Sequence, residues 1–137
     1  MLEITGILET ALYVGDVARS ASFYRSLFEF EVMVQDDRFC ALNVAGKHVL
    51  LLFRRGATKE ALTIPGGVIP GHDGSGETHF AFSIPASALE PWEKRLADRG
   101  VEIESKVSWE RGGHSLYFRD PDQHLVELAT PGLWPIY

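Results

Sequence analysis

The sequence predicts an α+β fold of two paired βαβββ modules that form a curved, cup-like mixed sheet with helices outside. The apolar periodicity reads strand, helix and three strands, and this order occurs twice along the chain. Two strand segments of the first half, Glu9–Val14 and His48–Phe53, match His79–Ile84 and His124–Ala129 of the second half. Because sheets of this size cannot bury their faces alone, we expect the two modules to pair around a concave face.

Length and composition are those of one globular domain. With 137 residues the chain can bury a sizeable core, and we expect a single domain over residues 1–137. Within it, module 1 covers about residues 5–56, a linking loop covers 57–76, and module 2 covers about 77–131. A net charge of −6 offers no basic surface, so we expect neither nucleic-acid nor membrane partners.

Cysteine content and the N-terminus both favour a cytoplasmic protein. The single cysteine, Cys40, excludes an internal disulfide and fits a reducing compartment. The N-terminal residues contain neither a basic region nor a long apolar run, so no signal peptide or membrane span is indicated. We therefore expect a cytoplasmic protein whose partners are small molecules or other proteins.

Local patterns place each element of the first module. Residues Ile7–Val14 alternate between the two faces of a strand, and Asp16 can cap the helix that follows. Apolar residues recur at helical spacing along that helix at Val17, Ala21, Tyr24, Leu27 and Phe28. Three more strands are expected at Glu31–Gln35, Phe39–Val44 and His48–Arg54.

The segment Arg55–Gly76 differs in composition from the strands before it. It holds six of the chain's 13 glycines, so we expect an irregular segment. So long an irregular segment inside a compact domain is normally a functional loop or a linker between structural halves, and we expect both roles.

The strand and helix pattern restarts after the loop. Residues Thr78–Ile84 predict a strand, and Ser87 and Glu90 have the spacing of a capping box at the start of a helix. That helix is expected to stop at Gly100. Residues Val101–Ser108 predict the next strand.

The closing hairpin contains an anomaly. Its strands are expected at Ser115–Arg119 and Leu125–Thr130, around the turn residues Asp120–Gln123. Glu127 lies in the middle of the otherwise apolar second strand, where an unpaired charge would be costly. Such a carboxylate is exposed on a half-solvated face, paired with a cation or bound to a metal, and the pattern leaves these alternatives open.

Strand parity brings Glu127 into a group of polar residues. Successive side chains of a strand point to opposite faces, so Glu127 lies opposite the core residues Val126 and Leu128. By the same rule His79 and Glu9 face away from the helices in their own strands. One face of the penultimate strand carries Ser115, Tyr117 and Arg119. An imidazole and two carboxylates on one concave face predict a metal site.

Three motifs carry a family resemblance: ALYVGDVARSASFY near the start, ETHFAF in the middle and LYFRDPDQHLVELA near the end. In order and spacing the chain resembles the vicinal oxygen chelate superfamily, which includes glyoxalases, bleomycin-resistance proteins, fosfomycin-resistance transferases and extradiol dioxygenases. The resemblance implies metal ligands at Glu9, His79 and Glu127. Tyr117 matches a tyrosine that the extradiol members carry before the final glutamate.

Three positions depart from the family pattern. Glu9 stands where His or Gln is common. Leu51 stands where glyoxalase I supplies an additional glutamate, which argues against that enzyme. Gln123 replaces a glycine at a position where a left-handed backbone is expected, and Gln tolerates that conformation less well.

The predicted ligands indicate a class of chemistry. One imidazole and two carboxylates favour Mn²⁺, Fe²⁺ or Mg²⁺, and Zn²⁺, Co²⁺ and Ni²⁺ are also compatible. We expect a divalent-metal-dependent enzyme, glyoxalase-, dioxygenase- or lyase-like, whose small substrate chelates the metal through vicinal oxygens. Tyr117 would donate a hydrogen bond to the substrate, and Arg119 would offset its negative charge.

Two other functions fit the same residues. In a metal-free protein that binds a small molecule or antibiotic, as bleomycin-resistance proteins do, Tyr13, Phe53 and the Arg55–Gly76 loop would form an aromatic clamp. Thiol transfer to an epoxide would need a cation for a phosphonate, for which Arg119 is the candidate.

Some histidines and the oligomeric state stay open at this point. His72 in the loop could act over the pocket as an acid or base, whereas His124 is expected to belong to turn structure. The resemblance implies a homodimer, with the pocket either within one chain or shared between two.

Overall fold

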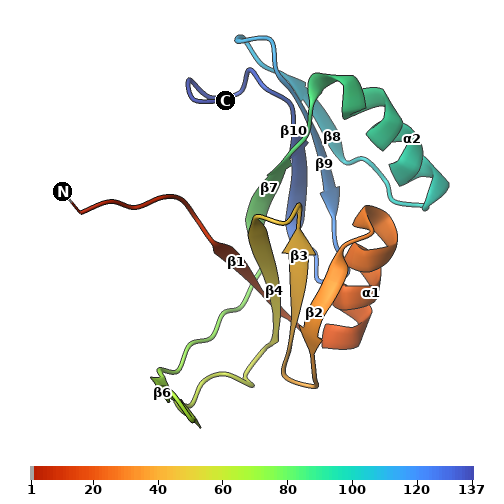
Figure 1. The fold of residues 1–137 in the computed structure, drawn as a ribbon. Coiled ribbons are helices and arrows are strands. Elements are labelled where there is room, and N and C mark those ends of the chain that lie inside the picture. Colours follow the sequence, from red (N-terminus) through yellow and green to blue (C-terminus); the bar gives the residue numbers. More distant parts are fainter. Residues whose placement is uncertain (1) are drawn as a thin grey trace. The chain divides into compact units, whose positions relative to one another are not determined.

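The computed structural model describes residues 2–137, and the chain divides into two compact units (Figure 1). The first unit ends at Gly76 and the second begins at Glu77. In the described residues, each unit carries one four-stranded mixed sheet and one α-helix. The order of strand, helix and three strands therefore occurs twice, and the predicted α+β class with two repeated modules is confirmed.

The first unit contains the elements predicted for module 1. Their bounds are β1 Glu9–Val14, α1 Val17–Phe28, β2 Glu31–Gln35, β3 Phe39–Val44 and β4 His48–Arg54. The sheet order is β1-β4-β3-β2, with β1 parallel to β4 and the other pairs antiparallel. Tyr13 lies opposite Phe53 in the register, and Phe53 lies opposite Phe39.

Helix α1 forms where its cap and apolar spacing predict it. The Asp16 carboxylate accepts a hydrogen bond from the backbone N–H of Arg19 at 3.0 Å. The buried residues of α1 are Val17, Ser20, Ala21, Tyr24 and Leu27. The helix packs against β3 and β4, where Leu42, Leu50 and Leu52 are buried. Phe53 and Tyr13, which alternate with these core positions, therefore lie on the opposite face of the sheet.

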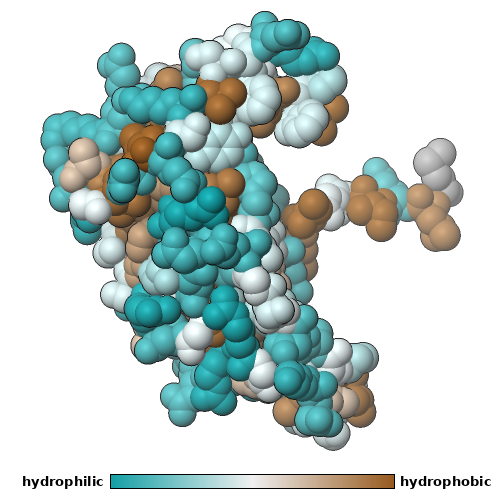
Figure 2. Space-filling view, turned by 180° about the vertical axis from the view of Figure 1, so that it is seen from behind, coloured by the Kyte–Doolittle hydropathy of each residue, from teal (hydrophilic) through white to brown (hydrophobic). Residues whose placement is uncertain are grey.

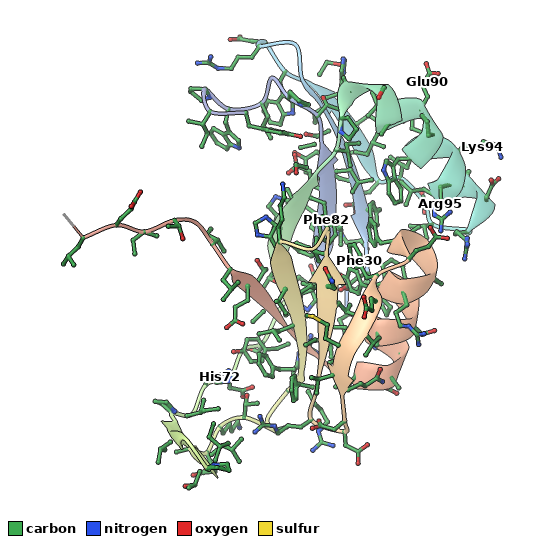
Figure 3. The ribbon with its side chains drawn as sticks, viewed as in Figure 1. Phe30, His72, Phe82, Glu90, Lys94 and Arg95 are labelled. Atoms are coloured by element: carbon green, nitrogen blue, oxygen red, sulfur yellow. The ribbon has the colours of Figure 1, made fainter. Side chains whose placement is uncertain are left out.

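The linking segment is more ordered than predicted, because it contains a small hairpin. Strands β5 Leu62–Ile64 and β6 Gly67–Ile69 pair in antiparallel fashion. The prediction of an irregular segment was wrong here, since short strands flanking a two-residue turn give little periodicity to detect. The chain returns through His72, whose backbone N–H donates to the Thr58 carbonyl at 2.8 Å. His72 is labelled on this returning stretch in Figure 3.

The second unit repeats the arrangement after a short 3₁₀ turn. Its elements are β7 His79–Ser83, η1 Ala86–Ala88, α2 Leu89–Asp98, β8 Ser105–Ser108, β9 His114–Arg119 and β10 Leu125–Ala129. The sheet order is β7-β10-β9-β8, with β7 parallel to β10. The core face consists of Leu116 and Phe118 from β9 together with Val126 and Leu128 from β10, all buried.

Two predicted details of this unit were wrong. The capping box does not form, because Ser87 lies inside the 3₁₀ turn and the helix N-cap, Ala88, has no side-chain hydrogen bond. The strand predicted from Val101 begins only at Ser105. Val101 instead closes the helix, with its N–H donating to the Leu96 carbonyl at 2.8 Å beyond a left-handed Gly100.

The closing turn has the predicted chemistry. The Asp120 carboxylate accepts hydrogen bonds from the backbone N–H groups of Asp122 and His124, both at 2.9 Å. Gln123 has φ of 67°, so the expected left-handed conformation is present although the residue is not glycine. The turn thereby sets the register of β9 and β10, in which Glu127 lies opposite Tyr117.

The residues ahead of β1 form an extended, apolar segment. Leu2, Ile4 and Ile7 are 102%, 90% and 77% exposed. Figure 2 shows brown side chains along a projecting stretch of chain. Among the described residues, no helix is both long and apolar enough to cross a membrane.

Candidate metal site

His79 and Glu127 meet on the face of the second sheet that is turned away from its core. Nε2 of His79 lies 3.2 Å from Oε1 of Glu127. Strands β7 and β10 are parallel neighbours in which His79 pairs with Leu125, so Glu127 is the next residue of β10 on the same face. The carboxylate is 4% exposed, whereas the imidazole is about half exposed, so solvent reaches the pair from the histidine side.

The imidazole of His79 is oriented by a backbone carbonyl. Its Nδ1 lies 3.0 Å from the carbonyl oxygen of Leu125, which can only accept, so Nδ1 carries a proton. In the neutral ring Nε2 then presents a lone pair toward Glu127. A lone pair and a carboxylate at this distance repel each other unless a cation joins them, either a second proton on the ring or a metal ion.

The carboxylate of Glu127 is held from its other side. Its Oε2 accepts a hydrogen bond from the Ser115 hydroxyl at 2.5 Å, and the Ser115 oxygen accepts one from Nε1 of Trp109 at 2.8 Å. Ser115 lies on β9, and Trp109 lies just after β8. Sequence reasoning placed Ser115 on the face of Tyr117 but did not link it to Glu127, because the two residues are diagonal neighbours that only the register defines.

Tyr117 is directly across the strand pair from Glu127. Its ring centroid lies 6.1 Å from that of His79. Burial raises the pKa of the Tyr117 hydroxyl, and the negative charge of Glu127 raises it further. The phenol therefore stays protonated at neutral pH and can act as a hydrogen-bond donor at the edge of the pair.

Arg119 is engaged in the structure of its own unit. Its Nε donates to the Glu104 carboxylate at 3.1 Å, and one terminal nitrogen donates to the Gln123 carbonyl at 3.1 Å. The same nitrogen lies 3.7 Å from the Glu77 carboxylate. These contacts favour a role for Arg119 in stabilising the turn, and its role toward a substrate stays a prediction.

Glu9, the third predicted ligand, lies on β1 in the first unit and is exposed. It pairs with Val49 in the β1–β4 register and, by parity, shares a face with Tyr13. Within residues 2–137, no three His, Cys, Asp or Glu side chains gather closely enough to hold a metal. The structure thus brings together two of the three predicted ligands, His79 and Glu127.

The donor chemistry of the His79–Glu127 pair fits a divalent ion. The 3.2 Å between Nε2 of His79 and Oε1 of Glu127 would let both atoms bind the same ion. The Leu125 carbonyl orients the imidazole as backbone carbonyls commonly do for metal-bound histidines. The deprotonated imidazole nitrogen and the carboxylate are the ligand types of Mn²⁺, Fe²⁺ and Zn²⁺ sites.

A separate aromatic cluster occupies the corresponding face of the first sheet. Tyr13, Phe53 and Phe39 stack in a row with ring centroids 5.8 Å apart. His72 reaches this row from the linking segment, with its Nδ1 2.6 Å from the Tyr13 hydroxyl and its ring 4.7 Å from Phe53. Burial, with the nearby charge of Asp73, raises the pKa of Tyr13, which favours its hydroxyl as the donor to His72.

The remaining histidine of the closing hairpin is structural. His124 is buried, and its Nδ1 accepts a hydrogen bond from the Thr78 N–H at 3.0 Å. The same nitrogen also lies 2.9 Å from the Thr78 hydroxyl oxygen. The expected assignment of His124 to turn structure agrees with these contacts, which join the turn to the chain just before β7.

Comparison with known proteins gives the same family for most of the chain. The family model described as the Glyoxalase/Bleomycin resistance protein/Dioxygenase superfamily matches residues 6–128. The metallothiol transferase FosB of Bacillus licheniformis is 33% identical over 129 residues, which cover 93% of this chain and 77% of that protein. The fosfomycin resistance protein FosX of Listeria innocua is 28% identical over 91% of this chain and 89% of its own length.

A solved structure agrees with the fold as well. The crystal structure of lactoylglutathione lyase from Agrobacterium tumefaciens aligns with a TM-score of 0.87 and 29% identity. The alignment covers 96% of this chain and 98% of the lyase. The chain belongs to the Glyoxalase/Bleomycin resistance protein/Dioxygenase superfamily, the group also known as the vicinal oxygen chelate superfamily.

Proposed function

We propose that this protein is a divalent-metal-dependent enzyme acting on a small substrate that chelates the metal through vicinal oxygens. The observation that carries the proposal is the His79–Glu127 pair, in which an oriented imidazole lone pair faces a buried carboxylate at 3.2 Å. A buried carboxylate beside a half-exposed imidazole is an arrangement that a cation stabilises and that solvent or substrate can reach.

The ligands of the metal would be His79, Glu127 and Glu9. The first two lie together, and Glu9 is assigned by its strand position and the family resemblance. Two carboxylates and one imidazole favour Mn²⁺, Fe²⁺ or Mg²⁺ among the divalent ions, with Zn²⁺, Co²⁺ and Ni²⁺ as other candidates. When bound, such an ion supplies Lewis-acid polarisation of substrate oxygens.

The protein groups around the pair would orient the substrate. Tyr117, protonated at neutral pH, would donate a hydrogen bond to a substrate oxygen. Ser115, itself buried, would hold Oε2 of Glu127 through its hydroxyl. Arg119 would contribute positive charge near the site, shared with the Glu104 carboxylate that it already binds.

The names of the relatives suggest substrates to test. Fosfomycin follows from the fosfomycin resistance protein, a thiol co-substrate follows from the metallothiol transferase, and lactoylglutathione follows from the lyase. Leu51 argues against the lyase reaction, because it stands where glyoxalase I supplies a glutamate. The engagement of Arg119 by Glu104 and Gln123 leaves that guanidinium poorly placed to serve as a phosphonate site.

Metal-free binding of a small molecule is the second candidate. The observation in its favour is the row of Tyr13, Phe53 and Phe39, which offers flat apolar surface on the face away from α1. His72 covers part of this row, so a planar aromatic ligand would compete with the loop for the same surface.

Metal analysis of protein purified without chelator tests the main proposal. About one equivalent of metal per chain, or uptake of one equivalent after addition of Mn²⁺ or Fe²⁺, is expected, with turnover of a vicinal-oxygen substrate that stops after chelation. Ligand binding that persists unchanged in chelator, together with no metal uptake, would instead support the binding protein.

The remaining proposals concern the oligomeric state and the cellular location of the protein. A homodimer is proposed from the family resemblance, and the exposed apolar segment of Leu2, Ile4 and Ile7 supports it, since such residues are usually covered in an assembly. A cytoplasmic location is proposed from the single buried cysteine, Cys40.

A further inference from the structure

We propose that Ser115 and Trp109 are positioning residues that hold Glu127 in one orientation for metal binding. The inference rests on the proposed function, because it assigns a role to these residues at the metal site suggested there. Neither residue belongs to the predicted ligand set. Each acts through Glu127, and together they form a chain of hydrogen bonds that begins in a turn and ends at the carboxylate.

The direction of this chain of hydrogen bonds follows from its donors. The indole nitrogen of Trp109 can only donate, so the Ser115 oxygen is the acceptor of the 2.8 Å bond. The single hydroxyl proton of Ser115 is then directed to Oε2 of Glu127 at 2.5 Å. Acceptance of the indole N–H polarises the hydroxyl and makes it a stronger donor to the carboxylate.

The two oxygens of the Glu127 carboxylate therefore have different partners. Oε2 is occupied by Ser115 in a buried environment, in which both residues are less than 5% exposed. Oε1 is the oxygen that faces His79 at 3.2 Å on the solvent-accessible side. The chain of hydrogen bonds from Trp109 through Ser115 to Glu127, here called the relay, therefore restricts rotation of the carboxylate about the Cγ–Cδ bond. Oε1 remains beside the oriented imidazole, where an ion can reach it.

The turn that carries Trp109 is itself fixed. The Trp109 N–H donates to the Gly113 carbonyl at 2.8 Å, and its carbonyl accepts from the Gly112 N–H at 2.9 Å. Gly113 lies against the tail so closely that an added Cβ would come within 2.6 Å of the Gly132 backbone. A rigid turn places the indole at the start of the relay without the entropy loss of ordering a free side chain.

The experiment is a Co²⁺ titration of the full chain, followed by the visible absorption of the bound ion and by calorimetry. The variants are Ser115→Ala, which removes the donor, Ser115→Thr, which keeps a hydroxyl, and Trp109→Phe, which removes the indole N–H. Ser108→Ala on the neighbouring strand and Trp134→Phe in the exposed tail are the matched controls. Circular dichroism and thermal melting of the metal-free proteins show whether each variant is folded.

We expect Ser115→Ala to weaken Co²⁺ binding by about 10- to 100-fold and to alter the absorption band, as loss of a group that orients a ligand does. Ser115→Thr should recover most of the affinity, Trp109→Phe should lose several-fold, and both controls should bind like the wild type. A role in folding alone would lower the melting temperature of Ser115→Ala without changing its affinity for the ion or its spectrum.

The outcomes separate this inference from the proposed function. Wild-type affinity in folded Ser115→Ala overturns the positioning role and leaves the metal site standing. Absence of Co²⁺ binding by the wild type overturns both. If Ser115→Ala does not fold, Trp109→Phe decides, because unchanged affinity and an unchanged spectrum in that variant overturn the relay.

Discussion

Oε1 of Glu127 lies 3.2 Å from Nε2 of His79, and Oε2 of the same carboxylate accepts the hydroxyl proton of Ser115. The carboxylate therefore has a hydrogen-bond donor at one oxygen and an imidazole beside the other, although it lies in a strand whose other residues are mostly apolar. Among the described residues, no buried side-chain nitrogen or oxygen lacks a hydrogen-bond partner, and this carboxylate follows that pattern.

Replacement of Glu127 by Gln should abolish metal binding. The amide keeps the size of the carboxylate but loses its charge, and amide groups are weak ligands for transition metals. We expect less than about one tenth of the wild-type metal content after purification and supplementation. Glu104→Gln, which changes an exposed carboxylate bound to Arg119, should keep wild-type metal content. Elemental analysis measures both, and full metal content in Glu127→Gln would contradict the ligand assignment.

Tyr117→Phe should lower turnover while metal binding stays. The phenol is expected to donate to a substrate oxygen in the transition state, and loss of one such donor costs about 100-fold or more in kcat. Steady-state kinetics with the substrate that proves active would show the fall mainly in kcat. Calorimetric titration with Mn²⁺ should show unchanged affinity. An unchanged kcat would assign Tyr117 to the pocket wall.

Gln123→Gly should stabilise the protein. Gln123 has φ of 67°, a conformation that costs an ordinary residue about 1–2 kcal/mol and glycine almost nothing. The backbone carbonyl of this residue still accepts the bond from Arg119, so that contact survives. Urea denaturation should give a higher free energy of unfolding by about 1 kcal/mol. Gln123→Ala, which removes the side chain without relieving the backbone, should bring no such gain.

The Cys40 thiol should be unreactive in the folded protein. Burial raises the pKa of this thiol, and the thiolate is the reactive form. A thiol reagent such as 5,5′-dithiobis(2-nitrobenzoic acid) at neutral pH should modify it at least about 100-fold more slowly than glutathione, and modification should become fast in urea. Rapid labelling of the native protein would show that β3 opens far more often than its buried position indicates.

His72→Ala should loosen the linking segment without affecting metal binding. His72 joins this segment to the aromatic row through Tyr13 and Phe53. A double-mutant cycle with Tyr13→Phe should give a coupling of about 1 kcal/mol, the usual value for a hydrogen bond of this kind. Hydrogen exchange of residues 57–76 should rise in His72→Ala. If the second candidate function is correct, this variant should also bind planar ligands more tightly, because the loop no longer competes.

Several features of the fold follow from neighbouring residues alone and were predictable. The helix after Asp16, the three strands that follow it and the Asp120–Gln123 turn each depend on capping, periodicity or turn chemistry within a few positions. Other local signals were overridden. Ser87 and Glu90 had the spacing of a capping box, but the chain after Pro85 forms a 3₁₀ turn, so Ser87 does not reach the N-cap position.

The sequence by itself determined which face of its strand each side chain occupies. The two-residue period of a strand put Glu127 and His79 on the side away from the core, and that prediction needs no knowledge of neighbouring strands. Only the tertiary structure decided the contacts, since strand register selects which side chains become diagonal neighbours. Ser115 became the partner of Glu127, and Trp109 the partner of Ser115, because β8, β9 and β10 pair in one particular alignment. Side-chain periodicity is a property of the strand, whereas hydrogen-bond partners are a property of the sheet.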